Sequence, residues 1–392
     1  MRIAVVIERI EIWRGGAETS TMELSRLLTE RGHEVHFITT TNSQSLPDIT
    51  VHTLPRPAVM RSRRTAAFVR HAAAFLNKHD FDIVHAISPL PGADVYQPRG
   101  GLLAETMARN VATRSTASRR LFKRAMLAMN VKQRALLELE RAIFRPDGPV
   151  IACVSDYVAR QCATFYEAQP PRTRVVFNGV NIPHLEAQDR LRQRSELRRE
   201  YGIADDTLLL LFIAHNFRLK GLYPLIETVS RLSVSGFHPF HLLVVGRDNI
   251  VPFQRRVHAL GLNRYVTFTG PTRRSISFYH GADVCVHPTY YDPCSRVVLE
   301  ALSAGLPTIT TAFNGAAEIM KDGLHGFIIK TPDDVGLWAR RIEELASPAL
   351  RKKMSANAEA LRDKISMRRH VEQLEQLFME CAENKKCPAA DR

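Results

Sequence analysis

The chain has 392 residues, with 54 Lys and Arg against 40 Asp and Glu, and a formal net charge of +14 at pH 7. Hydrophobic residues make up 45% and charged residues 24%, which excludes wholesale disorder. No apolar run approaches the ~20 residues that a membrane-spanning helix needs. The apolar start at residues 1–8 is too short and too soon charged for a signal peptide. We therefore expect a soluble, cytoplasmic protein of two or three domains.

Short apolar runs alternate with helical stretches along both halves of the chain. In the first half we predict strands and helices at 3–7, 17–31, 34–39, 64–78, 83–86 and 150–154. A polar segment from 178 to 202 predicts a linker and a leading helix. In the second half we predict strands at 208–214, 242–245, 266–269, 284–287, 308–311 and 327–330, with helices between them. Such alternation is typical of parallel sheets covered by helices.

This pattern predicts an α/β fold of two doubly wound, Rossmann-like domains. The first domain is predicted at residues 1–180 and the second at 181–366, and a last helix at 367–384 is expected to pack back on the first domain. Two such domains face a central cleft, in which ligands bind at the carboxyl ends of the strands.

The excess of positive charge is concentrated between residues 107 and 145. This segment carries ten basic residues against two acids, with apolar residues interleaved at helical spacing. A basic amphipathic helix of this kind favours contact with an anionic membrane surface, although a domain helix with one solvated face is the alternative. Few aromatic residues are present to stack on bases, so we do not expect nucleic acid as a partner.

The six cysteines do not form a recognisable framework. No two of them make a CxxC pair, and no spacing fits a zinc site. A disulfide scaffold is also unnecessary in a chain of this length. We expect buried or unreactive thiols.

In each predicted domain, the turn after the first strand could bind an anion. The turn in the first domain carries glycines, and the turn in the second carries cations. Gly15 and Gly16 open a helix, where a backbone without Cβ atoms and free N–H groups can approach an anion. Arg218 and Lys220 follow the strand at 208–214, and these two cations suit a diphosphate.

The most informative stretch is Tyr290 to Pro307. It holds two carboxylates eight residues apart, Asp292 in a loop and Glu300 about two turns into a helix. The N–H groups near Ser295, Arg296 and Val297 would lie at the start of that helix, where they could bind phosphate.

This order of loop acid, helix start and helix acid resembles the acid-x7-acid signature of retaining GT-B glycosyltransferases of the GT4 family. The resemblance extends over nearly the whole chain, through the motifs at 15–18, 218–221, 245–246, 268–270, 282–284, 314–318 and 322–326. The first acid is Asp292, one methylene shorter than the usual Glu. The stretch Pro91 to Tyr96 further resembles lipopolysaccharide-core glucosyltransferases of that family.

The resemblance implies transfer of a sugar from a nucleotide donor with retention at the anomeric carbon. It implies that Arg218, Lys220 and the helix start at Ser295, Arg296 and Val297 stabilise the leaving diphosphate. Asp292 would hold sugar hydroxyls and Glu300 the ribose. Gly15, Gly16 and Gly246 would also contact the donor, and Asp94 is a candidate for orienting the acceptor hydroxyl.

The expected donor is a nucleotide sugar, with UDP-glucose first and GDP-mannose or UDP-N-acetylglucosamine as alternatives. The expected acceptor is a lipopolysaccharide-core or other cell-envelope glycan or glycolipid at the cytoplasmic membrane face, which the enzyme would reach as a peripheral membrane protein through residues 107–145. No cofactor or metal is expected, since the DxD pattern Asp80-Phe81-Asp82 precedes a buried strand at the end away from the cleft. A sugar-nucleotide epimerase of the same fold is a further alternative.

Overall fold

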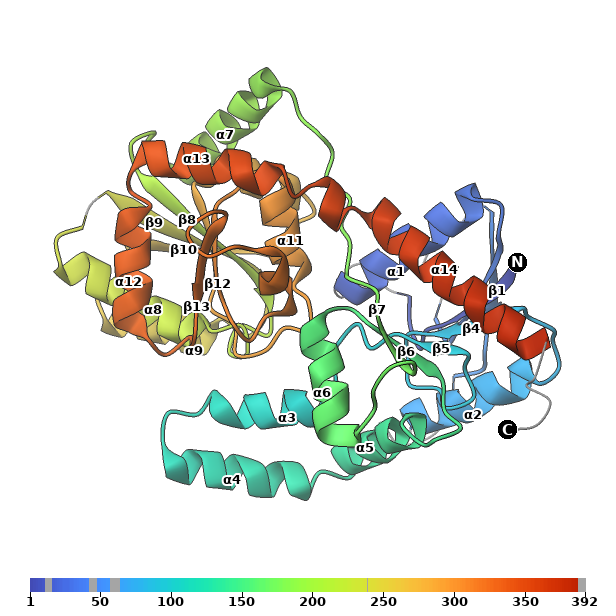
Figure 1. Ribbon diagram of the computed structural model, residues 1–392. Coiled ribbons are helices and arrows are strands. Elements are labelled where there is room, and N and C mark those ends of the chain that lie inside the picture. The colour runs from blue at the N-terminus through green and yellow to red at the C-terminus, as the bar shows by residue number, and fades with distance from the viewer. Residues whose placement is uncertain (11–15, 42–47, 57–63, 238, 387–392) are drawn as a thin grey trace. The chain divides into compact units, whose positions relative to one another are not determined.

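The computed structural model describes residues 1–10, 16–41, 48–56, 64–237 and 239–386. Its chain divides into two compact units (Figure 1). The first unit comprises Met1–Gly179 together with Met367–Arg392, and the second comprises Val180–Ser366. Each unit is built on its own parallel sheet.

The first unit holds a seven-stranded sheet in the order β3-β2-β1-β4-β5-β6-β7, in which every neighbouring pair is parallel. Its strands are β1 (Arg2–Val6), β2 (Glu34–Thr39), β3 (Ile49–Thr53), β4 (Ile83–Ala86), β5 (Val95–Tyr96), β6 (Val150–Cys153) and β7 (Thr173–Val175). Its helices are α1 (Gly16–Glu30), α2 (Arg64–Leu76), α3 (Leu103–Ala112), α4 (Ala117–Ala128), α5 (Val131–Ile143), α6 (Asp156–Tyr166) and α14 (Met367–Lys386).

The last helix, α14, contributes to the core of the first unit. Val371, Leu374 and Phe378 recur at helical spacing and are all buried in the cluster that also contains residues of β1 and β2. The helix packs against α1 and β4 (Figure 1). The burial of this apolar stripe explains why the end of the chain belongs to the unit in which the chain begins.

The second unit holds a six-stranded parallel sheet in the order β10-β9-β8-β11-β12-β13. Its strands are β8 (Leu208–His215), β9 (Phe240–Arg247), β10 (Val266–Gly270), β11 (Val284–His287), β12 (Thr308–Thr311) and β13 (Gly326–Ile329). Its helices are α7 (Ala187–Tyr201), α8 (Leu222–Val234), α9 (Val251–Ala259), α10 (Ser275–Gly281), α11 (Arg296–Ser303), α12 (Val335–Glu344) and α13 (Pro348–Glu359), with 3-10 turns η2 (Gly315–Ile319) and η3 (Asp363–Ile365).

Both sheets change winding direction beside their first strand, so the predicted doubly wound α/β class is confirmed. The predicted strands are present, but β3, β5 and β7 were not predicted. The basic segment 107–145 also differs from the prediction, because it contains parts of three helices and not one. Thr116 and Asn130 cap new helices within it, their side chains accepting from Arg119 N and Gln133 N.

In the part of the chain that the structure describes, none of the helices is both long enough and apolar enough to cross a membrane.

Candidate functional site

Two loops at the carboxyl edge of the second sheet are packed tightly together. Gly221 ends the loop after β8 with a φ of 83°, and a Cβ atom there would lie 1.8 Å from the carbonyl oxygen of Pro288, which follows β11. Tyr290 N–H donates to the Leu219 carbonyl over 2.9 Å. Only glycine allows this approach, which fixes the two loops against each other.

This packing brings together two of the predicted site residues, Lys220 and Asp292. The Lys220 ammonium lies 2.6 Å from Asp292 Oδ2 and donates to the Tyr291 carbonyl over 2.9 Å. An ammonium has three N–H donors, and these contacts engage two of them. The third leaves Lys220 able to donate to a phosphate oxygen while it stays paired with Asp292.

The electrostatics of this pair depend on its burial. Burial alone would raise the pKa of Asp292, but the Lys220 ammonium and the contact with His287 together outweigh it, and the pKa of this carboxyl lies well below its usual range. His287 Nε2 lies 3.4 Å from the same oxygen. Since burial lowers the pKa of His287, this imidazole is neutral at pH 7 and Lys220 is the cation that balances Asp292.

Asn314 is a residue whose role sequence reasoning missed. Its side-chain oxygen accepts from Ser295 N–H over 3.1 Å and from Ala316 N–H over 3.0 Å. Its amide nitrogen donates to Thr310 Oγ1 over 3.0 Å. Asp292 pairs with the same segment, since its N–H donates to the Phe313 carbonyl. The signal was present in the sequence as the motif 314–318, but its function as a support for the loop depends on tertiary contacts.

Helix α11 begins at the predicted phosphate-binding position. Ser295 is its N-cap, and the serine hydroxyl accepts from Val298 N–H. The backbone N–H group of Val297 lies in the first turn, where no intrahelical acceptor exists for it. The Ser295 N–H is already bonded to Asn314, so Val297 is the better donor for an anion.

Glu300 lies one helical turn beyond and is bound on both of its oxygens. Arg296 donates to Oε1 over 3.1 Å, and the buried Tyr279 hydroxyl donates to Oε2 over 2.7 Å. A carboxylate offers about four lone-pair sites, so two acceptor positions stay open for hydroxyl groups. The contact with Tyr279 was not predicted, because α10 is distant in sequence.

Arg218 and Gly246 have local structural partners. The Arg218 guanidinium lies 4.6 Å from the centre of the Tyr223 ring and does not join the Lys220 pair. Gly246 is in β9 with a φ of 136°, and a Cβ there would lie 1.9 Å from the Ala214 carbonyl oxygen. The pairing of β8 and β9 thus explains this glycine without a ligand.

In the first unit, the structure places the predicted residues apart from each other. Gly16 is the exposed first residue of α1, and Gly15 lies outside the described residues. Asp94 precedes β5 at the amino edge of the sheet, where its carboxylate accepts from Val84 N–H and from Lys385, each over 2.7 Å. This position does not support the predicted contact of Asp94 with an acceptor hydroxyl, because the strand edge that carries ligands is the opposite one.

A pocket of about 340 Å³ lies at the carboxyl edge of the first sheet. Glu8 follows β1 there, and its carboxylate accepts from Thr65 Oγ1 over 2.9 Å. Cationic side chains of Arg9, Arg64 and Lys132 also line the pocket. Sequence reasoning missed Glu8, because a single acid after a strand gives no motif.

The DxD pattern lies at the amino edge of the same sheet. Asp82 accepts from Arg2 N–H over 2.7 Å, and the Asp80 carbonyl accepts from the Arg2 side chain. Within the described ranges, no group of three or more His, Cys, Asp or Glu side chains is placed to hold a metal ion. The pattern therefore serves the start of β1.

The depressed pKa of Asp292 predicts acid sensitivity of the second unit. Because the folded state holds this carboxylate ionised more strongly than the unfolded state, its contribution to stability is complete above the ordinary carboxyl pKa of about 4. That contribution falls as the pH drops through 4 toward the lower folded value. Denaturant unfolding from pH 7 to pH 3 should show a steeper loss of stability for the unaltered protein than for Asp292→Asn. An equal pH dependence of stability in the unaltered protein and in Asp292→Asn would contradict this. So would a reduced pH dependence of the same size in the exposed control Asp206→Asn.

The sequence matches two family models that together cover both units. Residues 193–361 match "Glycosyl transferases group 1", and residues 14–183 match "Glycosyltransferase Family 4". The chain is 26% identical over 320 residues to the lipopolysaccharide glucosyltransferase WaaG of Escherichia coli, covering 81% of this chain and 82% of that one. It is also 26% identical over 398 residues to a D-inositol 3-phosphate glycosyltransferase of Geodermatophilus obscurus, covering 94% and 85%.

Solved structures agree with the fold. A crystal structure of WaaG superposes with a TM-score of 0.79 at 24% identity, covering 96% of this chain and 99% of that one. HepE of Anabaena, solved with UDP and glucose, gives a TM-score of 0.72 at 17% identity, covering 97% and 99%. The predicted GT-B fold is confirmed, and the chain belongs to family 4, group 1, of the glycosyltransferases.

Proposed function

We propose that this glycosyltransferase moves a hexose, with UDP-glucose as the donor, onto a lipopolysaccharide-core or other cell-envelope glycolipid with retention at the anomeric carbon. The observation that carries the proposal is the Lys220–Asp292 pair, 2.6 Å apart and beside the start of α11. The names of WaaG and of the HepE complex support glucose and UDP. Membership in a glycosyltransferase family favours transfer over the epimerase alternative.

Departure of the nucleoside diphosphate leaves a positive centre at the sugar, so the main catalytic task is to stabilise charge on the leaving group. Lys220 supplies a point charge with one N–H still available, and the first turn of α11 supplies a backbone N–H group at Val297. Arg218 adds a second cation once it turns from Tyr223. Asp292, fixed by Lys220, would accept from sugar hydroxyls.

Glu300 is proposed to hold the ribose. Its two oxygens are oriented by Arg296 and Tyr279, which leaves acceptor sites for the two ribose hydroxyls. Gly16 is proposed as a further donor contact from the first unit, whereas Gly246 is explained by its strand pairing.

The acceptor is proposed to bind in the pocket of the first unit. Glu8 can accept from the reacting hydroxyl, because Thr65 and Arg9 fix its carboxylate. Arg64 and Lys132 favour an acceptor that carries phosphate or carboxylate groups.

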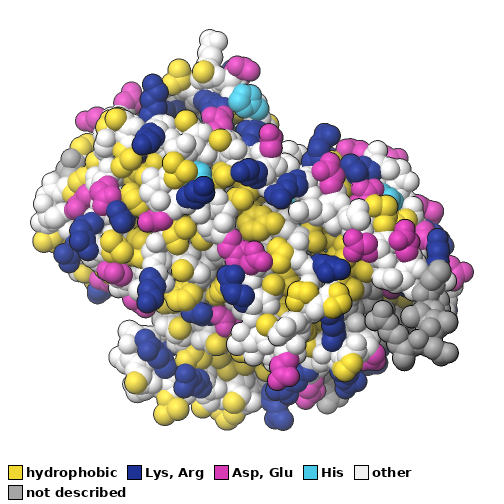
Figure 2. All heavy atoms as spheres, in the orientation of Figure 1, with side chains coloured by type: hydrophobic (Ala, Val, Ile, Leu, Met, Phe, Trp, Pro, Cys, Tyr) yellow, Lys and Arg dark blue, Asp and Glu magenta, His cyan; other side chains and the backbone are white. Residues whose placement is uncertain are grey.

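The surface beside this pocket favours a membrane-bound acceptor. We call it the α4 surface, and it comprises residues 117–131. Helix α4 buries none of its residues, and Leu121, Phe122 and Met129 are 69%, 68% and 73% exposed. Arg119, Arg120, Lys123 and Arg124 lie among them, and Figure 2 shows hydrophobic and basic side chains mixed over this helix. A helix that exposes both kinds of side chain suits an anionic membrane face, and Lys132 of the pocket follows directly.

Thermal unfolding with a panel of nucleotide sugars tests the donor. UDP-glucose, UDP-N-acetylglucosamine, GDP-mannose, UDP and GDP are each added with and without EDTA. A ligand at 100 times its dissociation constant should add about 2.7 kcal/mol of stability. We expect stabilisation by the UDP ligands, unchanged by EDTA, and lost in Glu300→Ala.

The exposed Glu196→Ala variant in the same unit is the control and should keep the shift. Stabilisation by GDP-mannose alone would show that GDP-mannose, and not UDP-glucose, is the donor. The absence of any shift in the unfolding temperature would contradict the donor site. The second candidate function is transfer to a phosphorylated soluble acceptor. The name of the D-inositol 3-phosphate glycosyltransferase relative describes such an acceptor. Product analysis with a lipopolysaccharide-core acceptor and with inositol 3-phosphate separates the two.

Neutralising the α4 surface should release the protein from vesicles. Each basic residue near an anionic surface contributes about 1 kcal/mol, so changing four of them to Gln should weaken binding roughly 10³-fold. The changed residues are Arg119, Arg120, Lys123 and Arg124. Co-sedimentation with phosphatidylcholine vesicles that contain or lack 30% phosphatidylglycerol measures this.

The matched control changes four exposed basic residues of the second unit to Gln. These are Arg192, Arg199, Arg340 and Lys353. It alters the net charge equally, so equal loss of vesicle binding in both variants would show that only the total charge matters.

A further inference from the structure

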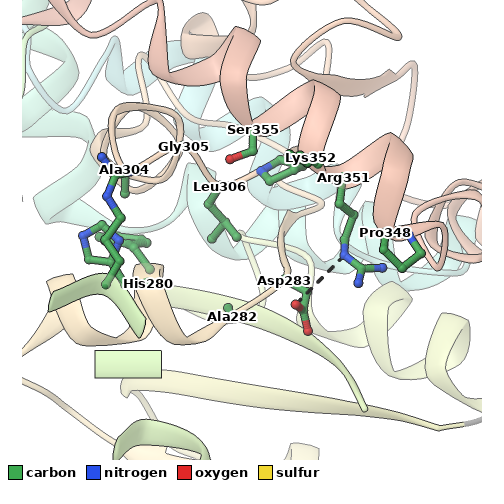
Figure 3. A pocket seen from close by; sticks show the side chains of 13 residues that line it. His280, Ala282, Asp283, Ala304, Gly305, Leu306, Pro348, Arg351, Lys352 and Ser355 are labelled. Carbon is green, nitrogen blue, oxygen red and sulfur yellow. Dashed lines mark ion pairs between the residues drawn. The ribbon is translucent and has the colours of Figure 1, made fainter. Parts of the chain in front are cut away.

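The second unit contains a pocket that the proposed reaction does not use. Its volume is about 300 Å³, at the lower end of the range for small-molecule sites. Asp283 precedes β11 and Leu306 precedes β12, so the pocket lies at the amino edge of the sheet (Figure 3). Lys220 and Asp292 lie at the carboxyl edge, and the two sites are therefore on opposite edges.

Arginines already balance Asp283, which lines this pocket, and Glu359, whose partner Arg190 lines it. The Asp283 carboxylate is bound by Arg194 over 2.8 Å and by Arg198 over 2.5 Å, and Arg351 Nε lies 4.0 Å away. The Glu359 carboxylate is bound by Arg190, which lines the pocket. Cations outnumber the acids, so the pocket carries a positive potential.

Several groups in the pocket remain free to bind a ligand. Lys352 is exposed at the pocket and has no ion-pair partner among the described residues. Ser355 lies one turn further along α13, with its hydroxyl directed toward Gly305. His280 Nε2 is buried and lacks a hydrogen-bond partner within the described part of the chain. Figure 3 shows these side chains around one space, with Lys352 and Ser355 on one wall and His280 on another.

The backbone adds to this potential. Pro348, at the first position of the twelve-residue helix α13, lines the pocket, so the positive end of the helix dipole lies beside it. Burial, followed by the charges of Arg190 and Arg362, lowers the pKa of His280 to about 4. A neutral imidazole among arginines can donate a hydrogen bond to an anion without adding charge.

Tyr279 connects the pocket to the donor site. Its side chain lines the pocket, and its hydroxyl donates to Glu300 over 2.7 Å. Helix α11 runs from its N-cap at Ser295 to the pocket residue Ala304. A ligand that shifts Tyr279 would therefore reorient the carboxylate assigned to the ribose.

We propose that this pocket binds a small phosphorylated molecule through Lys352, Ser355 and His280, and that its occupancy alters donor binding through Tyr279. The second part rests on the proposed function, whereas the binding itself does not. The shared chemistry is the phosphate group, which inorganic phosphate and a sugar phosphate both present.

Calorimetric titration of the full chain with inorganic phosphate and with glucose 1-phosphate tests the binding. Lys352→Glu should weaken binding at least tenfold, and Lys353→Glu, with the same charge change on the next residue, should leave it unchanged. Binding of glucose 1-phosphate alone would identify a sugar phosphate as the ligand. Equal loss in both variants, or no binding of either probe, would overturn the proposal.

The titration is repeated with Lys220→Met/Asp292→Asn, which removes both charges of the donor pair. Binding should persist there. If it is lost there and kept in Lys352→Glu, the phosphate occupies the donor edge and the proposal is wrong. The second readout is the KM for the donor, which should change with the bound probe in the unaltered protein and not in Lys352→Glu. An unchanged KM would overturn the coupling, and binding would still be decided by the titration.

Discussion

Replacing Lys220 by Met should lower kcat/KM roughly 10²–10³-fold, because a preorganised charge on the leaving diphosphate is lost. The same change leaves the largely buried Asp292 carboxylate without its cation, and breaking such a pair destabilises by about 3 kcal/mol. Steady-state transfer kinetics and denaturant unfolding measure the two effects separately.

The double variant Lys220→Met/Asp292→Asn distinguishes catalysis from support of the fold. Removing both charges should restore most of the lost stability, since no uncompensated carboxylate remains. Activity should stay low, because the cation is still absent. Recovery of activity together with stability would show that Lys220 acts only by holding the loop in place.

Most of the fold could be predicted from the sequence, because each buried parallel strand is a short apolar run. Leu208–His215 and Val284–His287 are such runs, and both were predicted to within a residue. Val95–Tyr96 is only two residues long and follows a turn, and the edge strand Ile49–Thr53 is polar and half-buried. Strands of this kind are stabilised mainly by pairing with neighbouring strands, so their own sequence gives little signal.

The basic segment shows a different limit. Its apolar spacing predicted one helical stretch, but the N-cap residues Thr116 and Asn130 divide that stretch into separate helices. A single threonine or asparagine between good helix formers is a weak signal for a helix boundary. The sequence also could not show that Leu121 and Phe122 stay exposed. That fact depends on the packing of α4, which contacts α3 and α5 but leaves Leu121 and Phe122 uncovered within the described chain.

For the candidate site, the motif order identified the segments but not their partners. Lys220 and Asp292 were assigned separate roles, and their direct contact depends on two loops 72 residues apart. Asp94 was assigned to the acceptor because of its local motif, yet its position at the amino edge follows from its pairing beside Val84. Gly246 was predicted as a donor contact, and the position of β8 gives this glycine a second, structural explanation that the sequence alone could not show.

That structural explanation predicts a large effect of Gly246→Ala on folding. The new Cβ would lie 1.9 Å from the Ala214 carbonyl oxygen, at a φ of 136° that L-residues rarely adopt. Ala214 and Gly246 are the seventh of the eight pairs between β8 and β9, so relieving the clash requires that the carboxyl ends of these two central strands separate. We expect a loss of about 4 kcal/mol or more, among the largest for single substitutions. Denaturant unfolding followed by circular dichroism measures it.

Gly261→Ala is the matched control in the same unit. Gly261 has a φ of 68°, but nothing lies within 4 Å of its Cβ position, so the substitution carries the backbone strain of about 1 kcal/mol without the clash. If Gly246→Ala is as stable as Gly261→Ala but loses donor binding, the glycine serves the ligand and not the sheet. If Gly246→Ala unfolds and Gly261→Ala does not, the carbonyl of Ala214 accounts for the glycine, and the proposed donor contacts of the second unit are those at Arg218, Lys220, Asp292, Glu300 and the start of α11.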